Sequence, residues 1–211
     1  MSTPGGCNAA SSSISAVPVF PIRVFGDPVL RRPTEPVEEV DDGLRQLVEA
    51  MFETMYLAPG VGLAAPQIGV QRRLFVYDAG DGPGVVLNPK LSGHAGEWTY
   101  NEGCLSVPNL HWPIVRAKQV HLDGMDLSGN TLSIDADELL ARVFQHEVDH
   151  LDGTLLIERL DPDQRREAMK VLRARALDGV NKAWMPGVDF TEDDEDAGPD
   201  TGADRPRGRR R

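Results

Sequence analysis

The sequence has 211 residues, 40% of them hydrophobic, which is enough to bury one core. Its formal net charge of −11 argues against a general nucleic-acid binder, because phosphate contacts require a basic face. The longest apolar runs, such as residues 84–87, are far shorter than the roughly 20 residues that span a bilayer. We therefore expect no membrane segment.

The amino-terminal region has the composition of a disordered leader. Residues 1–18 are rich in Ser, Ala and Gly and offer almost nothing to bury. They also lack the basic stretch and continuous apolar run of a secretory signal peptide. The chain has two cysteines, Cys7 and Cys104, which are too few for a disulfide-stapled secreted fold. We therefore expect a cytoplasmic protein in a reducing setting.

Residues 42–56 are predicted to form the first helix. Apolar side chains recur there at helical spacing, at Leu44, Leu47, Val48, Met51 and Met55. Charged residues occupy the other face, and Pro59 and Gly60 end the pattern. We expect this helix mainly to pack against the core.

The glycine-rich stretch 59–70, PGVGLAAPQIGV, contains a single polar side chain, Gln67. It has neither GK[ST] nor GxGxxG, so a phosphate cradle is a poor explanation. One interpretation is a tight loop with a solvent-facing amide. The other is a backbone rail for an extended peptide, with Gln67 donating to a carbonyl oxygen that becomes an oxyanion.

Strand-like pieces follow before the next helix. They cover residues 73–78, 84–89, 96–101, 114–126 and 131–134, and the turn-rich LSGN joins the last two. Because these pieces are clustered and do not alternate with helices, the predicted class is α+β with antiparallel pairing.

The second helix, predicted over residues 136–152, carries the motif QHEVDHLDG. With 3.6 residues per turn, His146 and His150 project from one face and both imidazoles can reach one metal ion. Glu147 lies beside that face, where it can accept a proton from a water at the metal. The alternative is an ordinary helix whose histidines form hydrogen bonds in the core.

An open catalytic metal site usually has three protein ligands. The candidate third donors are Cys104, His111, His121, His94 or an acid. Cys104 stands out because it lies in NEGCLSVP, between a glycine that permits close backbone approach and a proline that ends the stretch. A small buried hydrophobic side chain is the other common role of a free cysteine.

A third helix is predicted over residues 162–178, with Asp161 as its cap, Pro162 at its first position and Gly179 at its end. From residue 186 an acidic block and then five arginines follow, which is typical of a disordered tail. The predicted organisation is a leader over 1–18, one catalytic domain over 19–185 and a charged tail over 186–211.

Three motifs together resemble the peptide deformylases, which remove the N-formyl group from the initiator methionine of new proteins. The stretches are GVGLAAPQ (60–67), EGCLS (102–106) and QHEVDHLDG (145–153), in the order of the family's motifs, with the similar lead-in GDPVLRRP (26–33) upstream. The resemblance extends over about residues 20–180.

The resemblance implies a set of site residues. The family's metal ligands fall on Cys104, His146 and His150, and its general acid/base on Glu147. Its oxyanion donors fall on the Gln67 side chain and the Leu105 backbone N–H. The implied fold has antiparallel sheets around a central metal-binding helix, with a C-terminal helix packed outside. This agrees with the α+β class predicted from the pattern.

The resemblance also implies one divalent metal ion, Fe²⁺ in many members, with Zn²⁺, Ni²⁺ or Co²⁺ able to replace it. Thiolate and imidazole ligands suit both zinc and ferrous iron. The expected substrate is an N-formylmethionyl nascent peptide, and the products are formate and a free amino terminus. The loop of Gly60, Val61 and Gly62 is expected to exclude acyl groups bulkier than formyl.

The methionine pocket is expected from the resemblance to include Leu139, Arg142 and Val143, with His111 and Trp112 at its rim. Many relatives have an apolar residue at the position of Arg142 and an arginine at that of His111. These two departures bear on pocket shape and peptide contacts.

Three further residues are expected to support the ligands. Glu102 is expected to pair with Arg116 and to fix the loop that presents Cys104, and its alternative is a solvated acid. Gln145 is expected to orient a ligand.

Two rival functions share some of these features. A zincin-type metallopeptidase has HExxH but normally takes its third ligand from downstream of the helix. A catalytically inactive peptide-binding relative would tend to lack Glu147 or a ligand. The deformylase is expected to be a monomer, and the arginines of the third helix or the tail could contact ribosomal RNA weakly; a solvated helix face is the alternative.

Overall fold

The computed structural model describes residues 17–177 and 183–187. The leader predicted over 1–18 and the tail predicted over 186–211 lie almost entirely outside the described residues. Gly179, at which the third helix is expected to end, also lies outside them.

The first helix, α1 (Asp42–Leu57), confirms the periodicity prediction. Asp41 caps it, because the Asp41 carboxylate accepts a hydrogen bond of 2.7 Å from the Leu44 N–H. Its buried side chains include Leu44, Val48 and Met51. Two short 3₁₀ helices flank this region, η1 (Pro28–Arg31) before it and η2 (Ala65–Ile68) after it.

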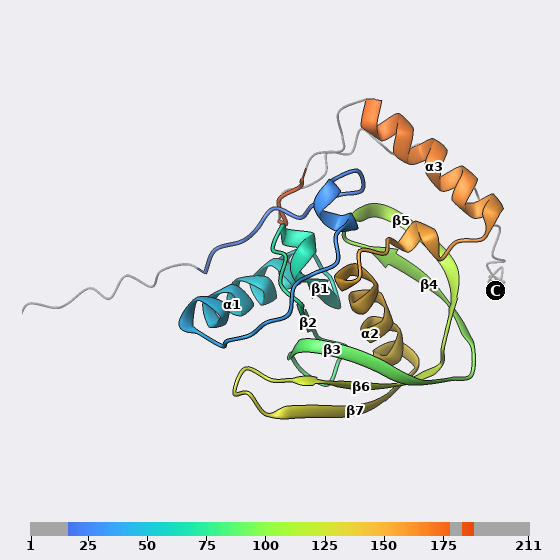
Figure 1. The fold of residues 1–211 in the computed structure, drawn as a ribbon. Coiled ribbons are helices and arrows are strands. Elements are labelled where there is room, and N and C mark those ends of the chain that lie inside the picture. Colours follow the sequence, from blue (N-terminus) through green and yellow to red (C-terminus); the bar gives the residue numbers. More distant parts are fainter. Residues whose placement is uncertain (1–16, 178–182, 188–211) are drawn as a thin grey trace, which may run out of the picture.

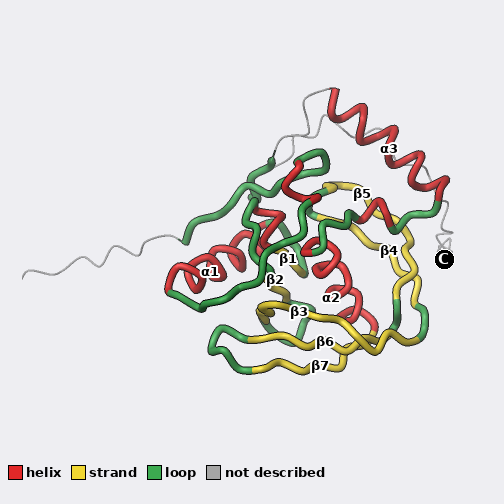
Figure 2. Tube along the Cα trace, viewed as in Figure 1, coloured by secondary structure: helices red, strands yellow, loops and turns green. Residues whose placement is uncertain are grey.

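The strands form two antiparallel sheets, which confirms the α+β prediction. The larger sheet has the order β1-β2-β3-β6-β7, with β1 (Gly62–Ala64), β2 (Leu74–Tyr77), β3 (Gly84–Ala95), β6 (Gln119–Met125) and β7 (Thr131–Asp137). The smaller sheet is the hairpin of β4 (Trp98–Cys104) and β5 (Val107–Arg116). Figure 2 shows the larger sheet below and the hairpin above to the right.

The central helix, α2 (Glu138–Leu151), lies between the larger sheet and the hairpin (Figure 1). It begins later than predicted because β7 continues to Asp137. Gly153 follows the last turn with a φ of 75°, as expected for a residue that ends a helix in the left-handed conformation.

The two long helices α1 and α2 pack on opposite faces of the larger sheet. Leu74 and Val76 on β2 pack with the α1 residues, whereas Phe75 between them packs with the α2 residues. This follows from the alternation of side chains along a strand. The Phe75 and Phe144 rings have centroids 5.9 Å apart, which fixes α2 on its face of the sheet.

The outer helix α3 (Pro162–Leu177) begins as predicted, with the Asp161 carboxylate accepting from the Asp163 and Gln164 N–H groups. It buries only Ala168 and Leu172, which pack with the 3₁₀ helix η3 (Leu156–Glu158) and β5. None of the helices described is both long and apolar enough to cross a bilayer.

The prediction of one strand over residues 114–126 is wrong. The segment belongs to two strands in different sheets, β5 and β6, with a break at Ala117 and Lys118. The Gln145 side chain binds both backbone groups of Ala117, with its Oε1 accepting at 3.2 Å and its Nε2 donating at 2.9 Å. This contact from α2 comes from a distant part of the sequence, so the local pattern contains no signal of the break.

Candidate metal centre

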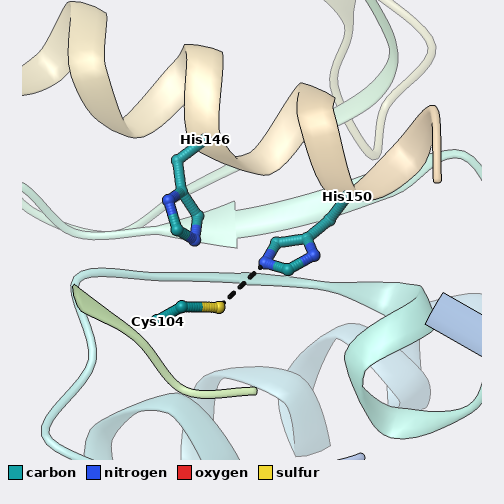
Figure 3. Close-up of side chains that lie close together, drawn as sticks. All are labelled: Cys104, His146 and His150. Atoms are coloured by element: carbon teal, nitrogen blue, oxygen red, sulfur yellow. Dashed lines mark hydrogen bonds between the residues drawn. The ribbon is translucent and has the colours of Figure 1, made fainter. Parts of the chain in front are cut away.

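Three metal-ligating side chains converge between α2 and the end of β4 (Figure 3). The candidate ligand atoms of Cys104, His146 and His150 all lie within 4.8 Å of one another. The Cys104 Sγ lies 3.2 Å from the His150 Nε2. Ligand atoms that each lie about 2.0–2.3 Å from one tetrahedral metal ion are separated from one another by distances of the order seen between these three side chains. The three side chains therefore fit a single cation.

The orientation of His146 is set by Glu102. Its Nδ1 lies 2.7 Å from the Glu102 Oε1, which leaves Nε2 as the nitrogen available to the cluster. A carboxylate behind a ligating histidine is a common arrangement, because it fixes the ring and raises its basicity. β4 supplies both Glu102 and Cys104, so one strand presents a ligand and the partner of another ligand.

The charges of the cluster also suit a cation. Burial opposes ionisation of the Cys104 thiol, but His150 and His146 outweigh it and lower the pKa of Cys104 to about 5. The thiolate is the form of cysteine that binds metals. The His150 Nε2 is the nitrogen that faces the Cys104 Sγ, so it is the candidate ligand atom of that ring.

Glu147 lies beside the cluster and is only 3% exposed. Burial raises the pKa of its carboxyl to about 7, against the opposing charges of His146 and His150. Within the described chain its Oε2 has no hydrogen-bond partner. Gly62 on β1 lies so close that a Cβ there would overlap the carboxylate. Glu147 is therefore a buried carboxyl poised to exchange a proton near neutral pH.

Gln67 is 1% exposed and is fixed at both ends of its amide. The Ala64 N–H donates to its Oε1 at 2.8 Å, and its Nε2 donates to the Ser106 Oγ at 3.2 Å. The same Nε2 lies 3.9 Å from the Cys104 Sγ. The amide donor therefore points at the cluster, which excludes the solvent-facing interpretation of this side chain.

The stretch that contains Gln67 is a short strand followed by a 3₁₀ helix, β1 and η2, where the sequence indicated only a glycine-rich turn. β1 pairs with β2 through Gly62, Leu63 and Ala64. A strand of this length carries too few residues for a period-two pattern to be recognised.

Glu102 is the centre of a buried ion-pair network. Arg116 donates to both of its oxygens, and Arg142 donates to the Oε2. Although burial alone would raise the pKa of Glu102, hydrogen bonds from Arg116 and His146 hold it well below its usual range. Arg116 also pairs with Asp149 at 2.8 Å, so the network joins β4, β5 and α2.

Replacing Glu102 with glutamine is expected to destabilise the protein by about 3–5 kcal/mol, because the buried Arg142 then lacks a compensating charge and Arg116 keeps only Asp149. Urea unfolding in the presence of a chelator measures this without a contribution from metal binding. Asp152→Asn is the control. It breaks the ion pair between Asp152 and Arg73, in which the Asp152 side chain is 54% exposed. The control should change stability by less than about 1 kcal/mol. Equal effects of the two changes would contradict a structural role for the network.

The cluster opens into a pocket of about 710 Å³, within the usual range for small ligands. Most of the residues predicted to contact substrate line it: Gly60, Val61, Gly62, His111, Leu139, Arg142 and Val143. Trp112, predicted at the rim, packs instead against the core cluster of β5, η3 and α3. Gln67, Leu105 and Glu147 line it as well. The pocket therefore connects the candidate ligands with the predicted peptide contacts.

Arg142 lines the pocket, but its charged group is engaged elsewhere. Besides Glu102, the guanidinium donates to the carbonyl oxygens of Trp98 and Ile114. It lies 5.0 Å from the Trp98 ring centroid and 5.7 Å from that of Tyr100. Arg142, where many relatives have an apolar residue, is thus a buried connection between α2 and the hairpin.

Some candidates lie away from the site. His121 on β6 binds the exposed Asp135, and His94 lies at the exposed end of β3, so neither joins the cluster. Gln145 contacts Ala117 and Ala141 rather than a ligand. Two contacts near the site were not predicted: Ser106, the last residue of the EGCLS motif, binds Gln67, and Trp184 lines the pocket from beyond α3.

A family model described as Polypeptide deformylase matches residues 19–166 of this chain. A curated protein of Acidothermus cellulolyticus named Peptide deformylase is 52% identical over 155 residues. That alignment covers 74% of this chain and 86% of the relative.

The chain is also similar to solved structures of peptide deformylases. The crystal structure of peptide deformylase from Thermus thermophilus has a TM-score of 0.73 and 42% identity, and the match covers 78% of this chain and 100% of that one. A peptide deformylase from Legionella pneumophila has a TM-score of 0.72 and 39% identity, with 78% of this chain and 99% of that one covered.

Proposed function

Because this chain belongs to the peptide deformylase family, we propose that it removes the formyl group from the N-terminal formylmethionine of newly made polypeptides, using one divalent metal ion. The chain is a hydrolase of that family, as its relatives are. The observation that carries the proposal is the convergence of three ligand atoms within 4.8 Å beside a buried carboxyl. The alternative of a zincin-type metallopeptidase is not favoured.

In the proposed site Cys104, His146 and His150 hold the cation. When bound, the cation supplies Lewis acidity, which makes a water molecule more acidic and a carbonyl carbon more electrophilic. The residues of the chain then have to bind the formyl group, direct the water and move its proton.

Glu147 is proposed as the group that moves the proton. Its carboxylate accepts a proton from the water whose oxygen attacks the formyl carbon. The C–N bond then breaks, and Glu147 returns the proton to the departing amine. The products are formate and a free methionyl amino terminus. The raised pKa of about 7 supports this role, because it lets the carboxyl both accept and release a proton near neutral pH.

Two donors are proposed to stabilise the oxygen that becomes negative, the Gln67 Nε2 and the Leu105 backbone N–H. The fixed orientation of the Gln67 amide supports the first assignment. Donors held in place before the reaction stabilise developing charge without a cost of reorganisation.

Removing the Gln67 amide is expected to lower the turnover number by about 10²–10³-fold, the usual effect of losing one oxyanion donor. The measurement is formate release by Gln67→Ala, with metal content determined in the same samples. Gln71→Ala is the matched control, because Gln71 bonds to the Val29 carbonyl and does not line the pocket. If Gln67→Ala lost its metal instead, the proposed role would be refuted.

The bound peptide is proposed to lie along the pocket, with methionine against Leu139, Arg142 and Val143. The loop of Gly60, Val61 and Gly62 would exclude an acyl group bulkier than formyl. The placement of these residues along one pocket supports this arrangement. An acetyl-methionyl peptide should therefore compete poorly with the formyl peptide.

The native metal is proposed to be Fe²⁺, with Zn²⁺, Ni²⁺ or Co²⁺ as substitutes. Thiolate and imidazole donors accept all four ions, so supply in the cell can decide among them. Metal analysis of anaerobically purified protein tests this, because a thiolate ligand is open to oxidation. Predominantly zinc in such a preparation would refute the assignment of iron.

The chain is further proposed to act as a cytoplasmic monomer that meets its substrate at the ribosome. The arginines of α3 could contribute a weak contact, although Arg166 pairs within the helix with Asp163 at 3.0 Å. If truncation at Pro186 leaves salt-dependent ribosome binding unchanged, the tail has no part in it.

A further inference from the structure

A short segment beyond α3 returns to the site. Residues 183–187 lie beside the amino-terminal segment, drawn in red and blue in Figure 1. Trp184 and Ile22 form an antiparallel bridge, with the Ile22 N–H donating to the Trp184 oxygen at 2.8 Å and the Trp184 N–H donating to the Ile22 oxygen at 3.0 Å. Ile22 is fully buried, so the segment is attached to the core.

The Trp184 side chain reaches the site itself. Its indole Nε1 donates to the Leu105 carbonyl oxygen at 3.0 Å. Trp184 and Gly187 also line the pocket that contains Glu147. The segment lies beyond residue 166, where the match to the family model ends.

The amino-terminal segment that pairs with Trp184 also binds the backbone of Gln67 and of Ser106. The Arg23 N–H donates to the Gln67 carbonyl oxygen at 2.6 Å, and the Phe25 N–H donates to the Ser106 carbonyl oxygen at 2.8 Å. The backbone next to both proposed oxyanion donors, at Gln67 and at Ser106, is therefore bound by the amino-terminal segment that pairs with Trp184. Trp184 supplies the contact to Leu105.

The backbone N–H and the backbone carbonyl of Leu105 have different roles. Its N–H is the proposed oxyanion donor, and its carbonyl accepts the indole hydrogen bond. The Leu105 carbonyl and the Leu105 N–H lie in neighbouring peptide planes that meet at one Cα, so holding the carbonyl restrains the N–H through the φ and ψ angles of Leu105. Hydrogen bonds weaken steeply as they depart from linearity, so the direction of that N–H determines its strength as a donor.

We propose that Trp184 is a positioning residue, which holds the Leu105 turn so that the Leu105 N–H points at the reacting oxygen. The bridge to Ile22 places the ring, and the indole N–H sets the turn. This inference rests on the proposed function, because it concerns the oxyanion donor of that reaction.

The test compares Trp184→Phe, which keeps a ring but removes the N–H, with Met185→Ala in the same full-length chain. Met185 is 43% exposed and does not line the pocket. The kcat of Trp184→Phe for a formyl-methionyl dipeptide is expected to fall about two- to tenfold, the value of one neutral hydrogen bond. The KM and metal content should stay at wild-type values, the melting temperature should fall by no more than the few degrees that loss of one hydrogen bond causes, and Met185→Ala should match the wild type throughout.

The other outcomes overturn the inference. An unchanged kcat in Trp184→Phe would show that the indole bond does not matter for turnover. A rise in KM alone would make Trp184 a substrate contact, and a fall in metal content, or in melting temperature with kcat unchanged, would make it a structural residue. Because every comparison is made against formate release by the wild type, absence of that activity would instead refute the proposed function.

Discussion

Glutamine in place of Glu147 is expected to lower the rate of formate release by about 10²–10⁴-fold, with fold and metal content unchanged. The amide keeps the shape of the side chain but cannot accept the proton of the attacking water. Glu102 also lines the pocket, but its carboxylate is engaged by Arg116, Arg142 and His146, so it is not free to replace Glu147. Single-turnover formate release, with metal analysis of the same samples, measures the effect.

Glu138→Gln is the matched control for this change. It makes the same substitution at the start of the same helix, where the side chain only pairs with Lys118 at the surface, at 3.3 Å. Turnover should remain at the wild-type value. If Glu147→Gln also kept wild-type turnover, Glu147 could not be the group that moves the proton.

Alanine in place of either Cys104 or His150 is expected to abolish metal retention. The loss of affinity should exceed the roughly 10–100-fold that follows loss of a hydrogen-bond partner of a ligand, because the bond to the ion itself is removed. Elemental analysis after gel filtration should give close to one ion per chain for the wild type and little for the variants. Formate release should fall in parallel with metal content.

His121→Ala controls for the loss of a histidine. His121 lies on β6 and contacts Ser133 and Asp135 at the surface, away from the cluster. This variant should keep both metal and turnover. Full metal content in the Cys104 and His150 variants would show that the cation is held elsewhere.

Much of the fold could be predicted from local patterns. The helix α1 could be predicted from its own apolar periodicity, and α3 from the cap Asp161 directly before it. The spacing of His146 and His150 placed both rings on one face of α2, because helix geometry alone decides it. Cys104 could be associated with them only through the order of three motifs, since no local spacing connects β4 with α2.

The features that could not be predicted depend on contacts between distant segments. The break between β5 and β6 is set by Gln145, which binds Ala117 from the central helix. Arg142 could be assigned to the pocket only by resemblance, and its contact with Glu102 shows how its buried charge is accommodated. Trp184 lies beyond the last predicted helix, and its bridge to Ile22 has no counterpart in the sequence pattern.

The most direct test of the proposed function is the fate of a longer formyl-methionyl peptide incubated with the metal-loaded full-length protein. Mass spectrometry of the peptide and an assay for formate are run on the same reaction. We predict one formate per peptide, a free methionyl amino terminus and no cleaved internal bond, with Glu147→Gln inactive. Internal cleavage without formate would contradict the deformylase assignment and would identify the site as that of a metallopeptidase.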